Sequence, residues 1–185
     1  MLARAAQAQL EKGVPALTGT LERISTLAQQ ALTEMRALLF ELRPSVLAEE
    51  GLAAALEQLT ASCRARFDLP VRFVGSVEAD VRLPMEVETA VFRIAQEALN
   101  NSAKHANATE VVVTMSVVEQ QLCVTVEDNG RGFDMEAVRA GARAGLDGGL
   151  GMRTMRERAT AAGIALRITS APGRGTRVWI AAPLP

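Results

Sequence analysis

The chain has 185 residues, a formal net charge of -1 and 49% apolar residues, so it can form one packed domain, alone or with an appendage. Its 20 basic and 21 acidic residues argue against direct nucleic-acid binding, which requires a basic excess. No apolar run of about 18 residues predicts a membrane span, and no segment resembles a signal peptide. We expect a cytoplasmic location, with any membrane anchor of the full-length protein upstream of this chain.

The first predicted element is a long helix whose apolar residues repeat at alternating steps of four and three. They are Leu17, Leu21, Ile24, Ala28, Ala31, Met35, Leu38 and Leu42. Such a heptad seam is typical of a helical bundle or coiled coil, and Pro15 and Pro44 occupy places where a helix begins and ends. Residues 1–12 could form the tail of an antiparallel partner helix, and a second copy of the chain could supply the rest. The alternative is a long helix packed against its own domain.

After residue 44 the pattern changes to helices that alternate with β-branched strands. We predict helices over residues 51–67, 84–106 and 152–162, and strands over residues 71–75, 110–118, 121–128, 165–171 and 176–182. This order indicates one layered domain, in which a mixed sheet carries helices on one face. Cys63 and Cys123 lack metal-binding spacing and are predicted to be reduced core residues.

The helix predicted over residues 84–106 has two different faces. Its apolar face is expected to pack on the sheet and consists of Val87, Val91, Ile94, Ala95, Ala98 and Ser102. Glu97, Asn101 and Lys104 lie on a second stripe. Oxygen ligands of this kind suit Mg²⁺ shared with substrate phosphates, with Asn101 as ligand, Glu97 as base or water holder, and Lys104 as phosphate partner. The alternative is a solvated polar face with a Glu–Lys pair.

A buried carboxylate is predicted at the end of strand 121–128. Leu122, Val124, Val126 and Asp128 share one face by period two, and three of the four are apolar. A buried carboxylate requires a donor, and the exocyclic amine of adenine is one possible donor. A hairpin turn at residues 128–130 is the alternative, but the residues that follow do not alternate like a returning strand.

Three glycine-rich segments could serve a phosphate or a pocket. Gly148, Gly149 and Gly151 precede the helix predicted over residues 152–162, where backbone amides could bind an anion. A flexible loop without ligand is the alternative. Upstream glycines at positions 130 and 132 would make the intervening loop mobile, as in a lid over a nucleotide. The turn before Thr176 joins two strands, and its hydroxyl could face a pocket.

Taken together, the segments EALNNSAKH, DNGRGFD, GGLGMRTMRERA and PGRGT resemble, in order, the ATP-binding boxes of sensor histidine kinases. The resemblance covers about residues 50–185. It implies the Bergerat fold of histidine kinases, gyrase and Hsp90-type ATPases, an α+β two-layer sandwich. The segments MRALLFELRPSVLAEEGLAAAL and MRERA resemble the subfamily that pairs with NarL/LuxR-type response regulators. In that subfamily the helix ending in LRP is the second helix of a dimerisation and phosphotransfer hairpin.

The resemblance assigns the phosphate side of the site to the central helix. Glu97 matches the base or water-holding carboxylate, and Asn101 matches the Mg²⁺ ligand. Lys104 and His105 match positions that approach the phosphates. Asn100 receives no role, because only one of the paired amides fits the spacing of four from Glu97.

The adenine side and the loops are assigned in the same way. Asp128 matches the carboxylate that reads the adenine amine, and Thr176 matches the hydroxyl that supports it through Asp128 and water. The glycines of the pocket, the hinge and the phosphate-side loop are matched by Gly130, Gly132, Gly149 and Gly151.

The resemblance also implies partners and missing parts. The only histidine, His105, belongs to the ATP-site motif, so we expect a truncated kinase whose acceptor histidine lies upstream. We assign residues 1–45 to the hairpin and residues 46–185 to the ATP-binding domain. The expected ligands and partners are ATP, Mg²⁺, a response regulator with a receiver domain and, at full length, a second copy. Two alternatives are an anti-sigma-factor-type serine kinase and a helical interaction module with a vestigial ATP site.

Overall fold

The computed structural model describes residues 45–75, 82–136 and 148–185. The helices are α3 (Ser45–Glu49), α4 (Leu52–Phe67), α5 (Met85–His105) and α7 (Gly148–Ala161). The strands are β1 (Val71–Gly75), β2 (Val111–Val118), β3 (Gln121–Asp128), β4 (Ala165–Ser170) and β5 (Thr176–Pro183). The predicted heptad helix over residues 17–42, its partner segment 1–12 and its boundary prolines lie outside the described residues.

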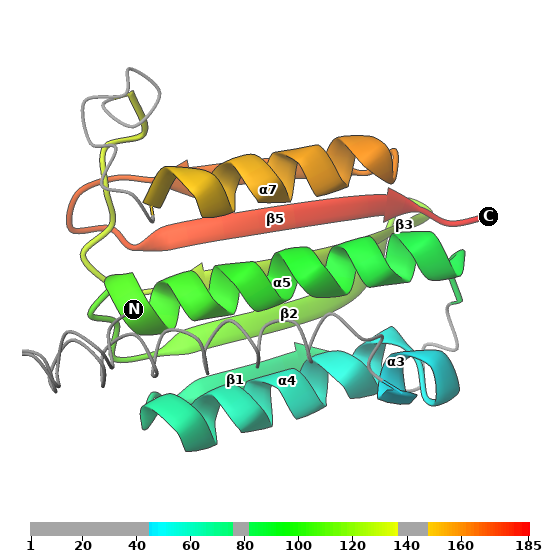
Figure 1. The fold of residues 1–185 in the computed structure, drawn as a ribbon, viewed down its shortest axis with the longest axis horizontal. Coiled ribbons are helices and arrows are strands. Elements are labelled where there is room, and N and C mark those ends of the chain that lie inside the picture. The colour runs from blue at the N-terminus through cyan, green and yellow to red at the C-terminus, as the bar shows by residue number, and fades with distance from the viewer. Residues whose placement is uncertain (1–44, 76–81, 137–147) are drawn as a thin grey trace, which may run out of the picture. The chain divides into compact units, whose positions relative to one another are not determined.

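The strands form one mixed sheet in the order β1-β2-β3-β5-β4 (Figure 1). β1 and β2 are parallel, and the remaining neighbours are antiparallel. A two-residue turn at Glu119 and Gln120 joins β2 to β3, and both residues have positive φ angles of 48° and 60°. The β2–β3 and β4–β5 pairs are hairpins, as the sequence predicted, so the carboxyl end of β3 lies beside the amino end of β5.

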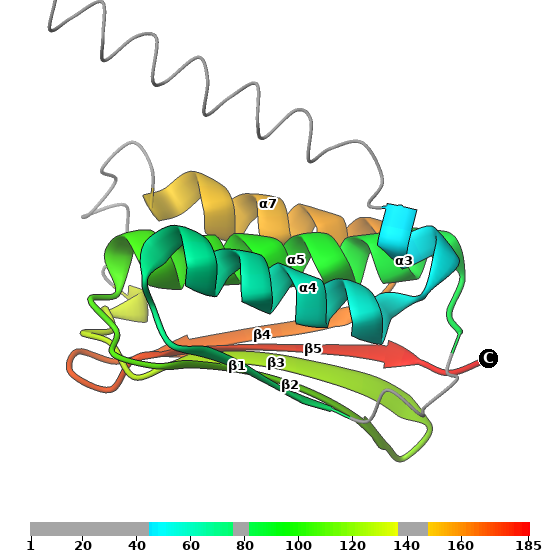
Figure 2. The same ribbon diagram turned by 90° about the horizontal axis from the view of Figure 1, so that it is seen from below.

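Helices α4, α5 and α7 cover the same face of the sheet, and the view from below shows a helical layer over a sheet layer (Figures 1 and 2). The predicted two-layer arrangement is therefore confirmed. The helix-facing side chains of the strands are apolar and buried, including Val113, Val124, Val126, Val178 and Ile180. Burial of such residues is the main favourable term in folding, at about 25 cal/mol per Å² of apolar surface.

The central helix α5 follows its predicted amphipathic pattern. Val91, Ile94, Ala95 and Ala98 are at most 3% exposed. Spacings of three and four place these side chains on one stripe, which packs against the sheet. The helix begins directly after Pro84 and ends at His105, within one residue of the predicted bounds. Its carboxyl-terminal turn therefore projects its polar residues at the end of the sheet where β3 finishes.

Two expectations need correction. Cys63 is a buried free thiol as predicted, and burial raises its pKa, with a smaller opposing effect from Arg66. Cys123 is also free but only half-buried, because it alternates with the helix-facing residues of β3. Helix α7 begins at Gly148, not after Gly151, so the glycines predicted to precede the helix form its first turn.

In the part of the chain that the structure describes, no helix is long and apolar enough to span a membrane.

We expect Ile180→Ala to lower the free energy of unfolding by about 2–5 kcal/mol, because Ile180 is 0% exposed and truncation leaves a cavity. Val118→Ala is the matched control. Val118 is 53% exposed, so its truncation should change stability by less than ~0.5 kcal/mol. Urea unfolding of both variants measures the difference. Equal losses in the two variants would contradict the assignment of the core to the helix-facing side of the sheet.

Candidate nucleotide-binding site

The buried carboxylate of Asp128 is the centre of the candidate site. Asp128 is 5% exposed and ends β3 on its helix-facing side, as predicted. Its Oδ2 accepts the hydroxyl of Ser102 at 2.9 Å, and its Oδ1 accepts the backbone N–H groups of Gly130 at 2.9 Å and Thr176 at 3.2 Å. A carboxylate offers about four acceptor positions. Among the described residues three donors occupy them, which leaves one position for a ligand donor.

Asp128 belongs to a polar row at the end of the sheet. Asp128 is the register partner of Thr176, and Thr176 is the register partner of Ser170, so the three lie side by side on β3, β5 and β4. The Ser170 hydroxyl lies 3.2 Å from the Thr176 hydroxyl and also contacts the carbonyl of Gly175 at 2.8 Å. The link from Thr176 to Asp128 runs through its backbone amide, whereas its hydroxyl contacts Ser170.

Glu97 and Asn101 form the second part of the site, on α5. Both are half-buried, and the Asn101 amide donates to the Glu97 carboxylate at 3.2 Å. Gly151, in the first turn of α7, lies directly against them. A Cβ atom at position 151 would collide with Glu97 Oε1 and would lie 3.2 Å from Asn101 Nδ2. Gly149 belongs to the same turn of α7, so the predicted glycine loop and carboxylate–amide pair are brought together.

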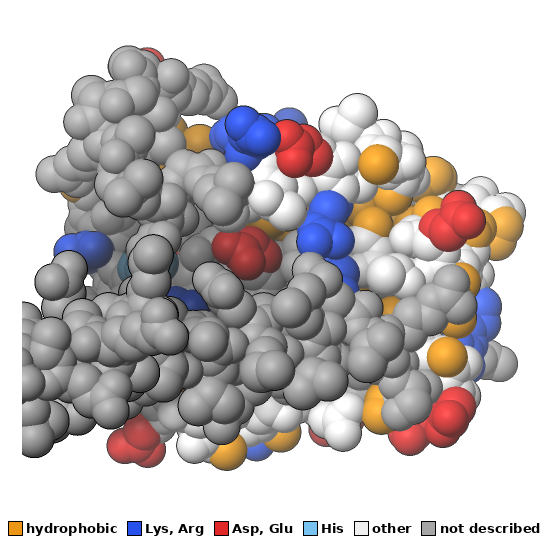
Figure 3. All heavy atoms as spheres, in the orientation of Figure 1, with side chains coloured by type: hydrophobic (Ala, Val, Ile, Leu, Met, Phe, Trp, Pro, Cys, Tyr) orange, Lys and Arg blue, Asp and Glu red, His pale blue; other side chains and the backbone are white. Residues whose placement is uncertain are grey.

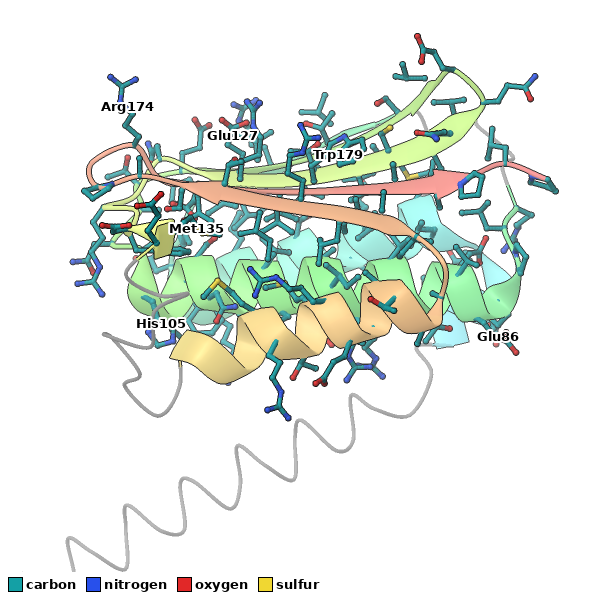
Figure 4. All side chains as sticks on the ribbon, turned by 90° about the horizontal axis from the view of Figure 1, so that it is seen from above. Glu86, His105, Glu127, Met135, Arg174 and Trp179 are labelled. Atoms are coloured by element: carbon teal, nitrogen blue, oxygen red, sulfur yellow. The ribbon has the colours of Figure 1, made fainter. Side chains whose placement is uncertain are left out.

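The two parts of the site meet on α5, because Asn101 and Ser102 are consecutive residues. Lys104 and His105 follow in the last turn and are exposed. His105 lies at the same end of the domain as Met135 and Arg174, whereas Glu86 marks the opposite end of α5 (Figure 4). Glu127 and Trp179 project from the other face of the sheet. The predicted phosphate-side and adenine-side residues therefore gather at one end of the domain.

The segment that follows Asp128 is tied down at several points. The N–H of Arg131 donates to the carbonyl of Ala106 at 2.7 Å, and its carbonyl accepts the N–H of Gly173 at 2.6 Å. A Cβ atom at Gly130 would collide with the Ala106 carbonyl, and one at Gly132 with the Ala171 carbonyl. These glycines are therefore required for close backbone approach. The hairpin alternative at residues 128–130 is wrong, and residues 137–147 of the predicted lid lie outside the described residues.

Three polar residues of the site were missed from the sequence. Ser102 was assigned to the sheet-facing stripe without a polar role, and Ser170 was assigned to a strand. Asn129 fixes the loop between α5 and β2. Its side-chain oxygen accepts hydrogen bonds from the N–H groups of Thr109 at 2.9 Å and Glu110 at 3.1 Å. The sequence offered one signal for these residues, which was the hydroxyl of Ser102 within an apolar stripe. A buried hydroxyl requires a hydrogen-bonding partner.

The charge distribution is mixed on the visible part of the helix face (Figure 3). On the visible part of the helix face, acidic and basic side chains occur in small neighbouring groups without a large patch of one sign (Figure 3). Among the described residues no three His, Cys, Asp or Glu side chains gather as a metal-binding cluster. Asn101 and the adjacent Glu97 alone do not complete the ligand shell of a cation, so the remaining ligands would come from water or from a bound anion.

Ser102→Ala should lower the free energy of unfolding by about 1–3 kcal/mol, because it leaves the buried Asp128 oxygen without its donor. Ser62→Ala is the matched control. Ser62 lies on the exposed side of α4, so the loss of its hydroxyl should cost less than ~0.5 kcal/mol. Urea unfolding distinguishes the two. A Ser102→Ala loss no larger than the Ser62→Ala loss would show that this hydrogen bond does not support the site.

Gly173 and Gly175 provide a second matched pair, with φ angles of 73° and 66° in the same turn. An alanine at either position is strained by about 1–2 kcal/mol in this left-handed backbone. A Cβ at Gly173 meets nothing within 4 Å, whereas one at Gly175 would collide with the carbonyl of Asp128. Gly175→Ala should therefore cost a further ~1–3 kcal/mol in thermal or urea unfolding. Equal costs would contradict the close approach of this turn to Asp128.

Comparison with known proteins identifies the family of the chain. Residues 86–185 match the family of histidine kinase-, DNA gyrase B- and HSP90-like ATPases, and residues 1–47 match a family described as histidine kinase. The chain is 32% identical over 184 residues to the sensor protein VraS of Staphylococcus aureus strain COL. The aligned region covers 100% of this chain and 49% of VraS. The chain therefore spans about half the length of the curated relatives that it matches.

Solved structures show the same fold. The histidine kinase domain of the blue-light activated histidine kinase from Erythrobacter litoralis EL346 is 28% identical, with a TM-score of 0.58 over 72% of this chain and 61% of that chain. Full-length ShkA, solved in complex with AMPPNP, is 25% identical, with a TM-score of 0.54 over 73% of this chain and 30% of that chain. The match of residues 1–47 favours the histidine-kinase interpretation over the serine-kinase alternative.

Proposed function

This chain belongs to the sensor histidine kinase family, and we propose that the site around Asp128, Asn101 and Glu97 binds Mg-ATP for phosphoryl transfer to a histidine. The observation that carries the proposal is the hydrogen bonding of Asp128. Its buried carboxylate keeps one acceptor position after three internal hydrogen bonds. A ligand that donates a hydrogen bond there gains a charge-assisted interaction in a water-poor environment.

Adenine is the base that this end of the site accepts in the proposal. Its exocyclic amine donates to Asp128, while Ser102 and two backbone amides hold the carboxylate in place. Gly130 and Gly132 allow the neighbouring backbone to approach closely, and the proposal assigns them to the lining of the base pocket. The relative ShkA was solved with an adenine nucleotide, AMPPNP, which supports this choice of ligand.

The triphosphate is assigned to the other side of α5. The first turn of α7 contains Gly149 and Gly151, and the N–H groups of a first turn have no partner within the helix, which favours an anion. Lys104 and His105 are exposed at the adjoining end of α5 and can approach the phosphates. The first turn of α7 and the last turn of α5 would thus surround the phosphates from two helices.

Mg²⁺ fits the donor set at the phosphate side, because a carboxylate and an amide supply hard oxygen atoms. Asn101 would ligate the ion through its side-chain oxygen, since its amide nitrogen already donates to Glu97. The ion would neutralise phosphate charge. Glu97 holds the Asn101 amide in this orientation and is placed to act as a base or to hold an ion-bound water.

The acceptor histidine in this proposal differs from His105, the only histidine of the 185 residues, because His105 is assigned to the ATP site. Residues 1–45 are assigned to the dimerisation and phosphotransfer hairpin, and residues 46–185 to the ATP-binding domain. The phosphoryl group would then pass to an aspartate of a receiver domain, in a NarL/LuxR-type response regulator. The active sensor would be a homodimer.

Calorimetric titration of ADP, with and without Mg²⁺, tests the proposed site directly. We expect micromolar binding by the wild-type chain. Asp128→Asn should weaken binding by about 1.5–3 kcal/mol, the value of a hydrogen bond to a charged group. Asn101→Ala should remove mainly the Mg²⁺-dependent part of the affinity.

Asn100→Ala is the matched control for Asn101→Ala, because these neighbouring amides point about 100° apart around the helix. It should leave the Mg²⁺ dependence unchanged. Circular dichroism of each variant confirms folding before titration. Absence of ADP binding by the folded wild-type chain, with and without Mg²⁺, would show that the proposed function is wrong.

A further inference from the structure

Neighbouring groups use the complete hydrogen-bonding capacity of the Ser170 hydroxyl. It lies 2.8 Å from the carbonyl of Gly175, 3.0 Å from the N–H of Phe133 and 3.2 Å from the hydroxyl of Thr176. A serine hydroxyl donates once and accepts twice. Three contacts therefore account for one hydrogen and two lone pairs, and the direction of each hydrogen bond follows from its partner.

The directions of these hydrogen bonds follow from two partners of Ser170, one of which can only accept and the other only donate. The Gly175 carbonyl can only accept, so the Ser170 hydrogen points to it. The Phe133 N–H can only donate, so it uses one lone pair of Ser170. The remaining Ser170 lone pair must accept from Thr176, so the Thr176 hydrogen points to Ser170 and away from Asp128. Only lone pairs of the Thr176 hydroxyl remain for a ligand.

We propose that Ser170 is a positioning residue that makes the Thr176 hydroxyl an acceptor, so that Thr176 and Asp128 together select a purine with an amino group at position six. The inference rests on the proposed nucleotide site. Thr176 and Asp128 are register partners with adjacent side chains, and Asp128 is itself an acceptor. The side chains of both residues therefore offer acceptors, and neither offers a donor.

The selection follows from the chemistry of the base. At position six, a six-amino purine offers two N–H donors, one for each of the two acceptor side chains. A six-oxo purine, such as hypoxanthine, presents a carbonyl oxygen there and would face lone pairs. Without Ser170 the Thr176 hydroxyl can rotate and donate to that carbonyl. The loss of Ser170 should therefore change which base is preferred as well as how tightly the site binds.

ADP and inosine diphosphate are suitable probes, because their bases differ only at position six and in the adjoining ring proton. The ratio of the two dissociation constants is measured for wild type, Ser170→Ala, Thr176→Val and the double variant. We expect wild type to prefer ADP, and each single variant to lower this preference by about 3- to 10-fold, the factor that one neutral hydrogen bond contributes. In the double variant the two effects should not add, because Ser170 acts through the Thr176 hydroxyl.

Thr169→Ala is the control, since Thr169 is the adjacent residue of β4 on the opposite face of the sheet and should leave the ratio unchanged. If Ser170→Ala does not fold, Ser170→Cys preserves the volume with a much weaker hydrogen-bonding group. Equal loss of ADP and inosine diphosphate affinity, or additive effects in the double variant, would overturn the inference while ADP binding by wild type upholds the nucleotide site. Failure of wild type to bind either probe would overturn both proposals.

Discussion

The need to satisfy one buried carboxylate organises the functional end of this domain. An ionised group at 5% exposure is tolerated only where donors surround it. The donors for Asp128 come from α5, from the segment after β3 and from β5, which are far apart in sequence. The close approach that they require explains the glycines at positions 130 and 175, where a side chain would collide with neighbouring carbonyl groups.

The same strands that form the core also present the site. Along β3 and β5 the helix-facing residues are apolar until the final row, where Asp128 and Thr176 replace them. The apolar rows beneath hold the strands in register, and a shift of one residue would turn the polar row to the opposite face. Specificity of the site and stability of the core therefore depend on the same register.

The sequence contained most of this arrangement because periodicity is a local signal. The period-two pattern of β3 placed Asp128 on the buried face, and the spacing along α5 placed Glu97 beside Asn101. The predicted start of α7 was wrong because glycine is a poor helix former, so the glycines were placed before the helix. The contact between Gly151 and Glu97 is tertiary and leaves no local pattern in the sequence. Ser170 was missed because its partners at positions 133 and 176 lie in other segments of the chain. The predictions for residues 1–44 stay predictions.

Helix α5 fixes the distance between the two halves of the proposed site. Asn101 and Ser102 are consecutive, so their side chains diverge by about 100° while their backbones advance by only ~1.5 Å along the helix. One side chain contacts Glu97 near α7, and the other contacts Asp128 on the sheet. Because a helix is stiff over so short a length, the phosphate side and the base side cannot move apart independently. A ligand that fills both halves of the proposed site would have to match a spacing determined by backbone geometry, so the site would select the length of a nucleotide in addition to the identity of its base.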